Sequence, residues 1–155
     1  MKLGIIAGGY APVDLSRATK RDLKYVEFCT NHDHESEALI ANYDNIKAEL
    51  EKTGISVASV GRWNSAPNTA NGVDKNVIEL HKRLIDTAAD LGSPVYTCGC
   101  NYVDEISLFK NYSNAVEFFG TVSEYAKSKG LKTAVYNCDW NNFVYSPREW
   151  EVILG

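Results

Sequence analysis

An arginine, a tryptophan and an asparagine stand together at Arg62, Trp63 and Asn64, directly after the apolar segment 55–61. A guanidinium forms paired hydrogen bonds with phosphate or carboxylate groups, and an indole ring packs against the face of a sugar. This trio is the strongest binding signal in the chain. The sequence supports a second interpretation equally well, in which the arginine stacks on a neighbouring ring at the surface.

Amide and aromatic side chains also follow the apolar segments 94–100 and 132–135. Amide and phenol groups donate and accept the hydrogen bonds that recognise hydroxyl groups. Asparagine is common in turns as well, and this is the role we expect for Asn141 and Asn142. If the strands are parallel, the substrate-binding side chains gather around a single opening. The residues predicted to bind substrate are Arg62, Trp63, Asn101, Tyr136, Asn137 and Trp140.

Glu27 and His32 are the candidate catalytic residues. Glu27 lies within an apolar segment where a lone carboxylate is costly to bury, so it either pairs with a cation, the more frequent case, or faces the site. His32 and His34 flank Asp33 beyond that segment, and an imidazole titrates near neutral pH, as a general acid or base must. Histidines in loops are more often solvated or cap a helix.

The four cysteines show neither paired C-x-x-C spacing nor the framework of a secreted protein. We expect them to be free thiols in a reducing compartment. Because they follow or end predicted strands, the alternative is a soft-metal site shared with His32 and His34. The cysteines are Cys29, Cys98, Cys100 and Cys138.

Five apolar segments alternate with amphipathic ones, and this alternation places the polar residues at the ends of strands. Continuous apolar strands are typical of parallel sheets that helices cover. Leu80, Leu84 and other apolar residues recur at helical spacing after Asp74, and Gly92 ends that stripe. His81 is predicted to lie on the surface of this helix. The predicted strands are 3–8, 25–31, 55–63, 94–101 and one from Lys132, and the predicted helices are 14–21, 36–52, 74–91, 112–129 and one from Pro147.

Length and charge restrict the class of protein. With 155 residues, of which 45% are hydrophobic and 23% charged, the chain is long enough for one domain with a core. A net charge of -4 and scattered basic residues give no support for nucleic-acid binding. No apolar run approaches the roughly 18 residues that span a bilayer, and the N-terminal segment lacks the features of a signal peptide. We expect a cytoplasmic protein without a membrane or nucleic-acid partner.

Two parallel α/β architectures compete. An open doubly wound sheet of five strands is complete at about this length, whereas a (β/α)8 barrel usually needs about 250 residues. Length alone favours the open sheet. The chain contains neither the G-x-G-x-x-G loop nor the G-x-x-x-x-G-K-[ST] loop, so both nucleotide-binding fingerprints are missing.

The order of five segments carries more weight in this choice than periodicity does, and the open doubly wound sheet stays the alternative. The chain reads GIIAGGY, KYVEFCTN, GISVASVGRWN, DTAADLGSPVYTCG and SKGLKTAVYNCDWNNFVYSPREW. This order resembles the xylose-isomerase-like sugar-phosphate isomerase/epimerase superfamily of TIM barrels, and the resemblance spans almost the whole chain. It implies that residues 1–155 form a single, incomplete (β/α)8 barrel, the N-terminal portion with five of its strands.

The resemblance implies that the complete barrel rearranges a hydroxy-carbonyl sugar or sugar phosphate by proton transfer, with a bound Mn²⁺ or Mg²⁺. Members usually carry a metal-binding Glu at the end of the fifth strand, and Tyr136 stands at the matching position here. The other ligands would come from further strands, so we expect neither a cofactor nor isomerase activity of this chain alone. The alternatives are a non-catalytic sugar-binding or structural half-barrel and a thiol-based metal-binding module.

An incomplete barrel leaves strand edges with unpaired backbone groups. A second copy of the chain is the simplest cover for such edges. We therefore expect a homo-oligomer.

Overall fold

The computed structural model describes residues 3–138 and 142–155. Its main sheet has five parallel strands in the order β1-β2-β3-β6-β7. The order follows the chain without the reversal of a doubly wound sheet, so the barrel-type prediction is confirmed and the open-sheet alternative is wrong. The strands are β1 (Gly4–Ala7), β2 (Tyr25–Thr30), β3 (Ser56–Arg62), β6 (Val95–Cys98) and β7 (Lys132–Val135).

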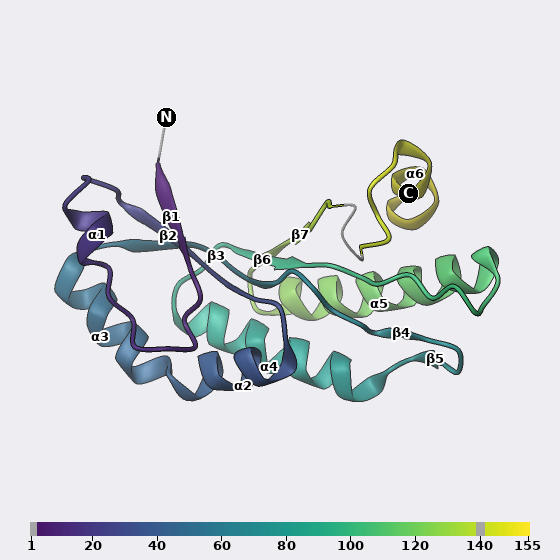
Figure 1. Ribbon diagram of the computed structural model, residues 1–155, viewed down its shortest axis with the longest axis horizontal. Helices are drawn as coiled ribbons and strands as arrows, with labels where there is room; N and C mark the ends of the chain where they lie inside the picture. Colours follow the sequence, from purple (N-terminus) through teal and green to yellow (C-terminus); the bar gives the residue numbers. More distant parts are fainter. Residues whose placement is uncertain (1–2, 139–141) are drawn as a thin grey trace.

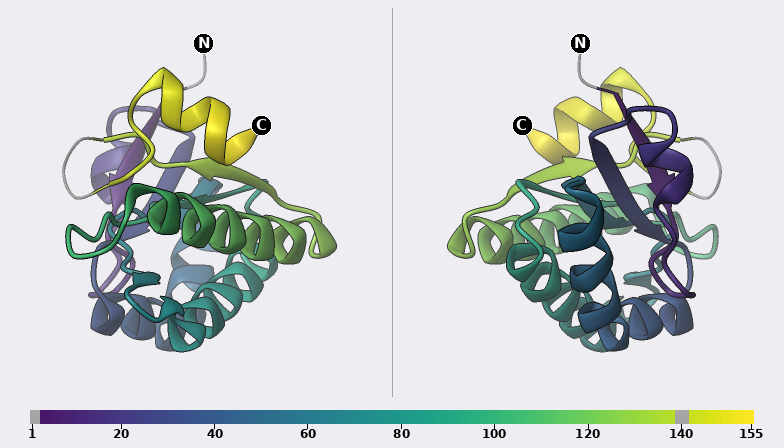
Figure 2. Two further views of the ribbon diagram at one scale, coloured as in Figure 1. Left: turned by 90° about the vertical axis from the view of Figure 1, so that its right-hand side faces the viewer. Right: turned by 90° about the vertical axis from the view of Figure 1, so that its left-hand side faces the viewer.

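Helices connect these strands, and α2, α3, α4 and α5 cover one face of the sheet (Figure 1). Figure 2 shows β7 between α5 and α6. Asp74 caps α4 by accepting a hydrogen bond from the backbone N–H of Asn76 at 2.8 Å, and Gly92 follows this helix with a φ of 74°. The helices are α1 (Ser16–Thr19), α2 (Asp33–Ala41), α3 (Tyr43–Thr53), α4 (Lys75–Asp90), α5 (Leu108–Ser128) and α6 (Pro147–Leu154).

The single helix predicted over 36–52 is two helices, α2 and α3, which meet at Asn42. The Asn42 side chain donates hydrogen bonds to the carbonyl oxygens of Gly9 at 2.9 Å and Ala11 at 3.0 Å. The break therefore fixes the loop between β1 and α1 to the helical layer. Apolar periodicity continues through such a break, and therefore periodicity alone does not reveal the break.

A short antiparallel hairpin follows β3, formed by β4 (Asn68–Thr69) and β5 (Gly72–Val73). No sequence pattern predicts this hairpin, because strands of two residues carry no periodicity. Buried Asn68 joins this hairpin to the loop after β6 through Asn101.

The two faces of the sheet differ in how they are covered. Val26, Phe28, Val60 and Tyr96 point toward the helices and are fully buried in one apolar cluster. Side chains alternate along each strand, so Ile6 lies on the opposite face, where 56% of it is exposed. This inner face also carries Glu27, which is in register with Ile6.

The prediction that His81 lies on a helix surface is wrong, because its exposed fraction is 0%. Its ring nitrogens lie 2.7 Å from the Ser65 hydroxyl and 2.7 Å from the Tyr96 hydroxyl. His81 stands four residues after Val77 and four before Ile85, which places it on the apolar stripe of α4. This spacing was the signal for its burial.

Candidate functional site

Polar strand ends surround a cavity of about 300 Å³ at the carboxyl edge of the sheet. In (β/α) folds this edge is where loops build binding sites. The cavity combines two aromatic rings, one imidazole, three amides and one thiol. Its lining residues are Asn31, His32, Trp63, Asn64, Tyr136, Cys138 and Asn142.

The rings of Trp63 and Tyr136 form one wall of the cavity. Their centroids lie 4.7 Å apart and their planes differ by 10°. Trp63 follows β3 and Tyr136 follows β7, and strand alternation turns both side chains to the inner face. Their backbone N–H groups donate to Thr30 at 3.0 Å and Cys98 at 2.9 Å, which fixes both residues to the sheet.

Glu27 orients the indole ring of this wall. Its carboxylate accepts a hydrogen bond from Trp63 Nε1 at 3.2 Å. Glu27 lies in β2 on the same inner face, where it is half-buried. The structure thus brings Glu27 together with Trp63 and Tyr136, and gives its carboxylate a neutral partner.

The phenol of Tyr136 is protonated at neutral pH. Partial burial, followed by the hydrogen bond with the Cys138 thiol, raises the pKa of Tyr136 above its usual value. A protonated phenol can both donate and accept a hydrogen bond.

His32 lies on the rim of the cavity, at the start of α2. Glu35 holds this rim, because its Oε2 accepts hydrogen bonds from the backbone N–H groups of Asn31 at 2.7 Å and His32 at 3.2 Å. The imidazole rings of His32 and His34 stack with centroids 5.5 Å apart. His32 is also the N-cap residue of α2, so a structural role accompanies its place on the cavity.

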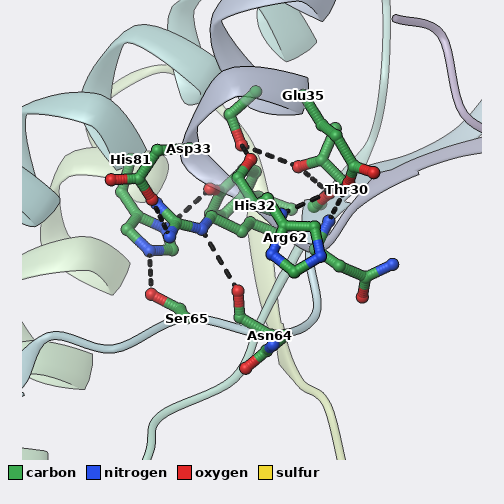
Figure 3. Close-up of polar contacts among 12 residues, drawn as sticks. Thr30, His32, Asp33, Glu35, Arg62, Asn64, Ser65 and His81 are labelled. Atoms are coloured by element: carbon green, nitrogen blue, oxygen red, sulfur yellow. Dashed lines mark hydrogen bonds and ion pairs between the residues drawn. The ribbon is translucent and has the colours of Figure 1, made fainter.

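Arg62 does not line the cavity. It precedes Trp63 in β3 and points to the opposite face, where only 3% of it is exposed. Figure 3 shows its guanidinium beside α2, where Nη2 pairs with Asp33, while Nε donates to the carbonyl oxygen of Asn64 at 3.2 Å. Two adjacent residues that the sequence analysis placed in one site therefore serve opposite faces of the sheet.

The remaining predicted residues also lie away from the cavity lining. Asn101 is buried, where its side chain accepts from Asn68 N at 2.9 Å and donates to Asn68 O at 3.1 Å. Asn137 is exposed and is not among the lining residues. Trp140 and Asn141 lie outside the described residues.

Asn64 belongs to the trio that gave the strongest binding signal, whereas three other lining residues were not predicted to bind substrate. Asn31 directly follows β2, so its position at a strand end was the available signal. Cys138 was considered only as a thiol, and for Asn142 a role in a turn was preferred to hydroxyl recognition. Gly99 explains how Asn142 reaches the site, because a Cβ at Gly99 would lie 2.0 Å from Asn142 Oδ1.

The described residues do not provide a metal centre. Among residues 3–138 and 142–155, no three His, Cys, Asp or Glu side chains converge on a possible metal position. Burial raises the pKa of Cys98 to about 12 and that of Cys29 to about 11, so both thiols stay protonated at neutral pH. Thiolates rather than thiols bind metal, and the soft-metal alternative gains no support.

No helix within the described part of the chain is long and apolar enough to cross a membrane.

Comparisons with known proteins agree with this fold. A family model described as "Xylose isomerase-like TIM barrel" matches residues 15–155. No curated protein matches the sequence. Among solved structures, a D-tagatose 3-epimerase-like protein superposes with a TM-score of 0.81 at 15% identity, over 99% of this chain and 60% of its own.

Two further structures superpose in the same way. The IOLI protein, whose crystal structure contains a zinc atom, gives a TM-score of 0.70 at 18% identity, over 99% of this chain and 58% of its own. D-psicose 3-epimerase with D-tagatose, from Clostridium cellulolyticum H10, gives a TM-score of 0.71 at 17% identity, over 96% of this chain and 57% of its own. At these identities the likeness shows the fold, and the chain spans less than two thirds of each of these structures.

Proposed function

Because the chain belongs to the xylose isomerase-like TIM barrel family, we propose that its cavity binds an uncharged sugar as part of an isomerase or epimerase site. The stacked pair of Trp63 and Tyr136 beside three amides is the observation that carries this proposal. An aromatic wall packs against the C–H face of a sugar ring, while amides exchange hydrogen bonds with its hydroxyl groups.

The roles of the lining residues follow from their chemistry. Trp63 and Tyr136 hold the apolar face of the sugar, and Glu27 keeps the indole in place through its hydrogen bond. Asn31 and Asn64 lie where they can bond to hydroxyl groups. His32 is the lining residue whose side chain can take up or release a proton at a ring nitrogen, so it is the proposed proton donor or acceptor.

The lining favours a free sugar over a sugar phosphate. Its residues, as far as the chain is described, include no lysine or arginine. A phosphate group needs a cation or several convergent N–H groups. The guanidinium of Arg62 cannot serve here, because it is buried on the other face and pairs with Asp33.

The divalent metal of the family does not fit the described residues. Tyr136 stands where members usually carry a metal-binding Glu, and its ring packs on Trp63. A neutral phenol in such a stack is a poor ligand for Mn²⁺ or Mg²⁺, which prefer carboxylates and water. We therefore assign no proton-transfer step to a metal, and this substitution favours non-catalytic sugar binding as the second candidate function.

The outer strands support the proposal of a homo-oligomer. Neither β1 nor β7 has a neighbour on its outer side within the described sheet. Exposed strand edges pair readily with another chain. Sedimentation equilibrium should detect assemblies larger than one chain, and a monomer at high concentration contradicts this proposal.

Binding is tested by titrating the chain with D-tagatose and D-fructose while recording tryptophan indole N–H resonances by NMR. We expect the Trp63 signal to shift with either sugar, with the same affinity in the presence of EDTA. The matched control is Trp150→Phe, because Trp150 lies on α6 outside the cavity lining. No shift at Trp63 with millimolar sugar contradicts the proposal.

Catalysis is tested by a second experiment. Incubation of the chain with each sugar, with and without added Mn²⁺ or Mg²⁺, followed by chromatography of the products, separates the two candidate functions. Conversion that is lost in His32→Ala supports the isomerase or epimerase, whereas binding without conversion supports the sugar-binding protein.

A further inference from the structure

The side chain of Arg62 lies between the sheet and the helical layer, with 4% of it exposed. It shares this face of β3 with Val60, while Trp63 and the cavity lie on the other face. Figure 3 shows the guanidinium surrounded by Asp33, Asn64 and His81. The contacts of this buried cation indicate its role.

Arg62 contacts both loops that carry the rim of the cavity. Its Nη2 pairs with Asp33, the first residue of α2, which directly follows His32. Its Nε donates to the carbonyl oxygen of Asn64 at 3.2 Å, in the loop that leaves β3. His32 and Asn64 both line the cavity, so one guanidinium ties two parts of the rim from behind.

Stability does not explain why this residue is an arginine. Asp33 is 68% exposed, so water screens its attraction to the guanidinium. Arg62 Nη1 is buried and has no hydrogen-bond partner among the described residues, which adds a desolvation cost. Apolar side chains of similar volume often stabilise a protein as well as a buried ion pair does, or better.

A hydrogen bond joins the loop beside Arg62 to α4. His81 bonds to Ser65 at 2.7 Å, which holds the residue next to Asn64 against α4. Burial, and then the neighbouring Arg62 cation, lower the pKa of His81 to about 3, so the imidazole is neutral and adds no second charge. The guanidinium therefore lies beside a loop that is hydrogen-bonded to α4, and it contacts Asn64 in that loop and Asp33 in α2.

We propose that Arg62 is a positioning residue, which holds the His32 loop and the Asn64 loop at the spacing that a sugar requires. This inference rests on the proposed function for its consequence, but not for its geometry. An arginine suits the task because its planar fork presents donors in two directions, whereas a lysine has a single ammonium group.

The test compares Arg62→Met and Arg62→Lys with the unaltered chain. Arg62→Met removes both contacts, so we expect the dissociation constant for D-tagatose to rise at least about tenfold while the melting temperature changes little. Backbone NMR signals of residues 31–35 and 63–65 should both shift. Arg62→Lys should restore the signals of 31–35 through Asp33, but leave those of 63–65 displaced.

The matched control is Arg83→Met. Arg83 Nη1 and Nη2 each donate a hydrogen bond to the Glu37 carboxylate at 2.6 Å, which links α4 to α2. Neither Arg83 nor Glu37 lines the cavity. This variant should leave sugar affinity and the signals of 31–35 and 63–65 unchanged. An equal loss of affinity in Arg83→Met would assign the effect to general loosening of the helices and overturn the proposal.

Two outcomes keep this inference separate from the proposed function. If the unaltered chain binds no sugar, the proposed function fails, and the NMR signals alone decide the role of Arg62. If Arg62→Met does not fold, Arg62→Lys decides it. Unmoved signals at 63–65 in Arg62→Lys overturn the proposal in either case.

Discussion

The indole of Trp63 and the phenol of Tyr136 lie nearly parallel, with centroids 4.7 Å apart, although β6 runs between the strands that carry them. Gly99, at the end of β6, makes this possible. A Cβ at Gly99 would lie 2.1 Å from the carbonyl oxygen of Trp63. The missing side chain thus lets the Trp63 backbone approach β6.

Gly99→Ala should displace Trp63 and weaken sugar binding. The clash involves backbone, which cannot rotate away, so we expect a loss of about 1–3 kcal/mol in unfolding free energy. Urea denaturation measures it. Gly120→Ala is the control, because a Cβ at Gly120 in α5 meets no atom within 4 Å, and it should stabilise the helix by about 0.5–1 kcal/mol. Equal stability changes of the two variants contradict the prediction.

Glu27 should support sugar binding through the indole of Trp63. Glu27→Ala removes the acceptor at 3.2 Å and should weaken D-tagatose binding severalfold, since a net hydrogen bond contributes about 1 kcal/mol. Glu27→Gln keeps an acceptor oxygen and should bind nearly as well as the unaltered chain. Calorimetric titration gives both constants. If Glu27→Gln loses as much affinity as Glu27→Ala, the negative charge rather than the hydrogen bond is required.

The stability of the fold should depend strongly on the side-chain amide of Asn68. Its Nδ2 donates to Asn111 Oδ1 at 2.6 Å, and its Oδ1 accepts from Asn114 Nδ2 at 2.6 Å, with all three side chains buried. Asn68→Asp places an oxygen opposite the Asn111 oxygen and buries a charge, so we expect a loss above about 3 kcal/mol. Asn71→Asp, on the exposed turn of the same hairpin, should change stability by less than about 0.5 kcal/mol. Thermal unfolding compares the two.

His81 should make the fold sensitive to acid. Burial, and then Arg62, lower its pKa from 6.5 to about 3. Between these values the unfolded chain binds a proton that the folded chain excludes, so stability is complete above pH 6.5 and decreases as pH falls toward 3. This one residue contributes a slope of up to about 1.4 kcal/mol per pH unit.

The variant that tests this slope is His81→Gln. It cannot titrate, so its unfolding free energy should depend less on pH between 6.5 and 5 than that of the unaltered chain. Urea denaturation at several pH values measures both slopes. Parallel slopes would mean that another group causes the acid sensitivity.

Periodicity and glycine stops were sufficient to predict most of the fold. The helix predicted over 74–91 is α4, and Asp74 and Gly92 delimit it as expected. The cause is local, because caps and apolar stripes are properties of neighbouring residues. The break at Asn42 was missed because it depends on contacts with Gly9 and Ala11, which are distant in sequence.

The site was predicted less well than the fold. Glu27, His32, Trp63 and Tyr136 do come together around the cavity, since all follow or belong to strands that share one edge. Arg62 does not, because alternation along β3 separates it from Trp63, and the sequence alone does not say which face is inner. The roles of all these residues in binding and catalysis remain predictions.

The two buried hydrogen bonds that link Ser65, His81 and Tyr96 must run in the same direction. A neutral imidazole carries one hydrogen, so it donates on one side and accepts on the other. When the Ser65 hydroxyl donates a hydrogen bond to the ring, the ring donates one to the Tyr96 hydroxyl. In the opposite arrangement the Tyr96 hydroxyl donates to the ring and the ring donates to the Ser65 hydroxyl. Reversing this polarity requires the ring to change tautomer while both hydroxyls rotate.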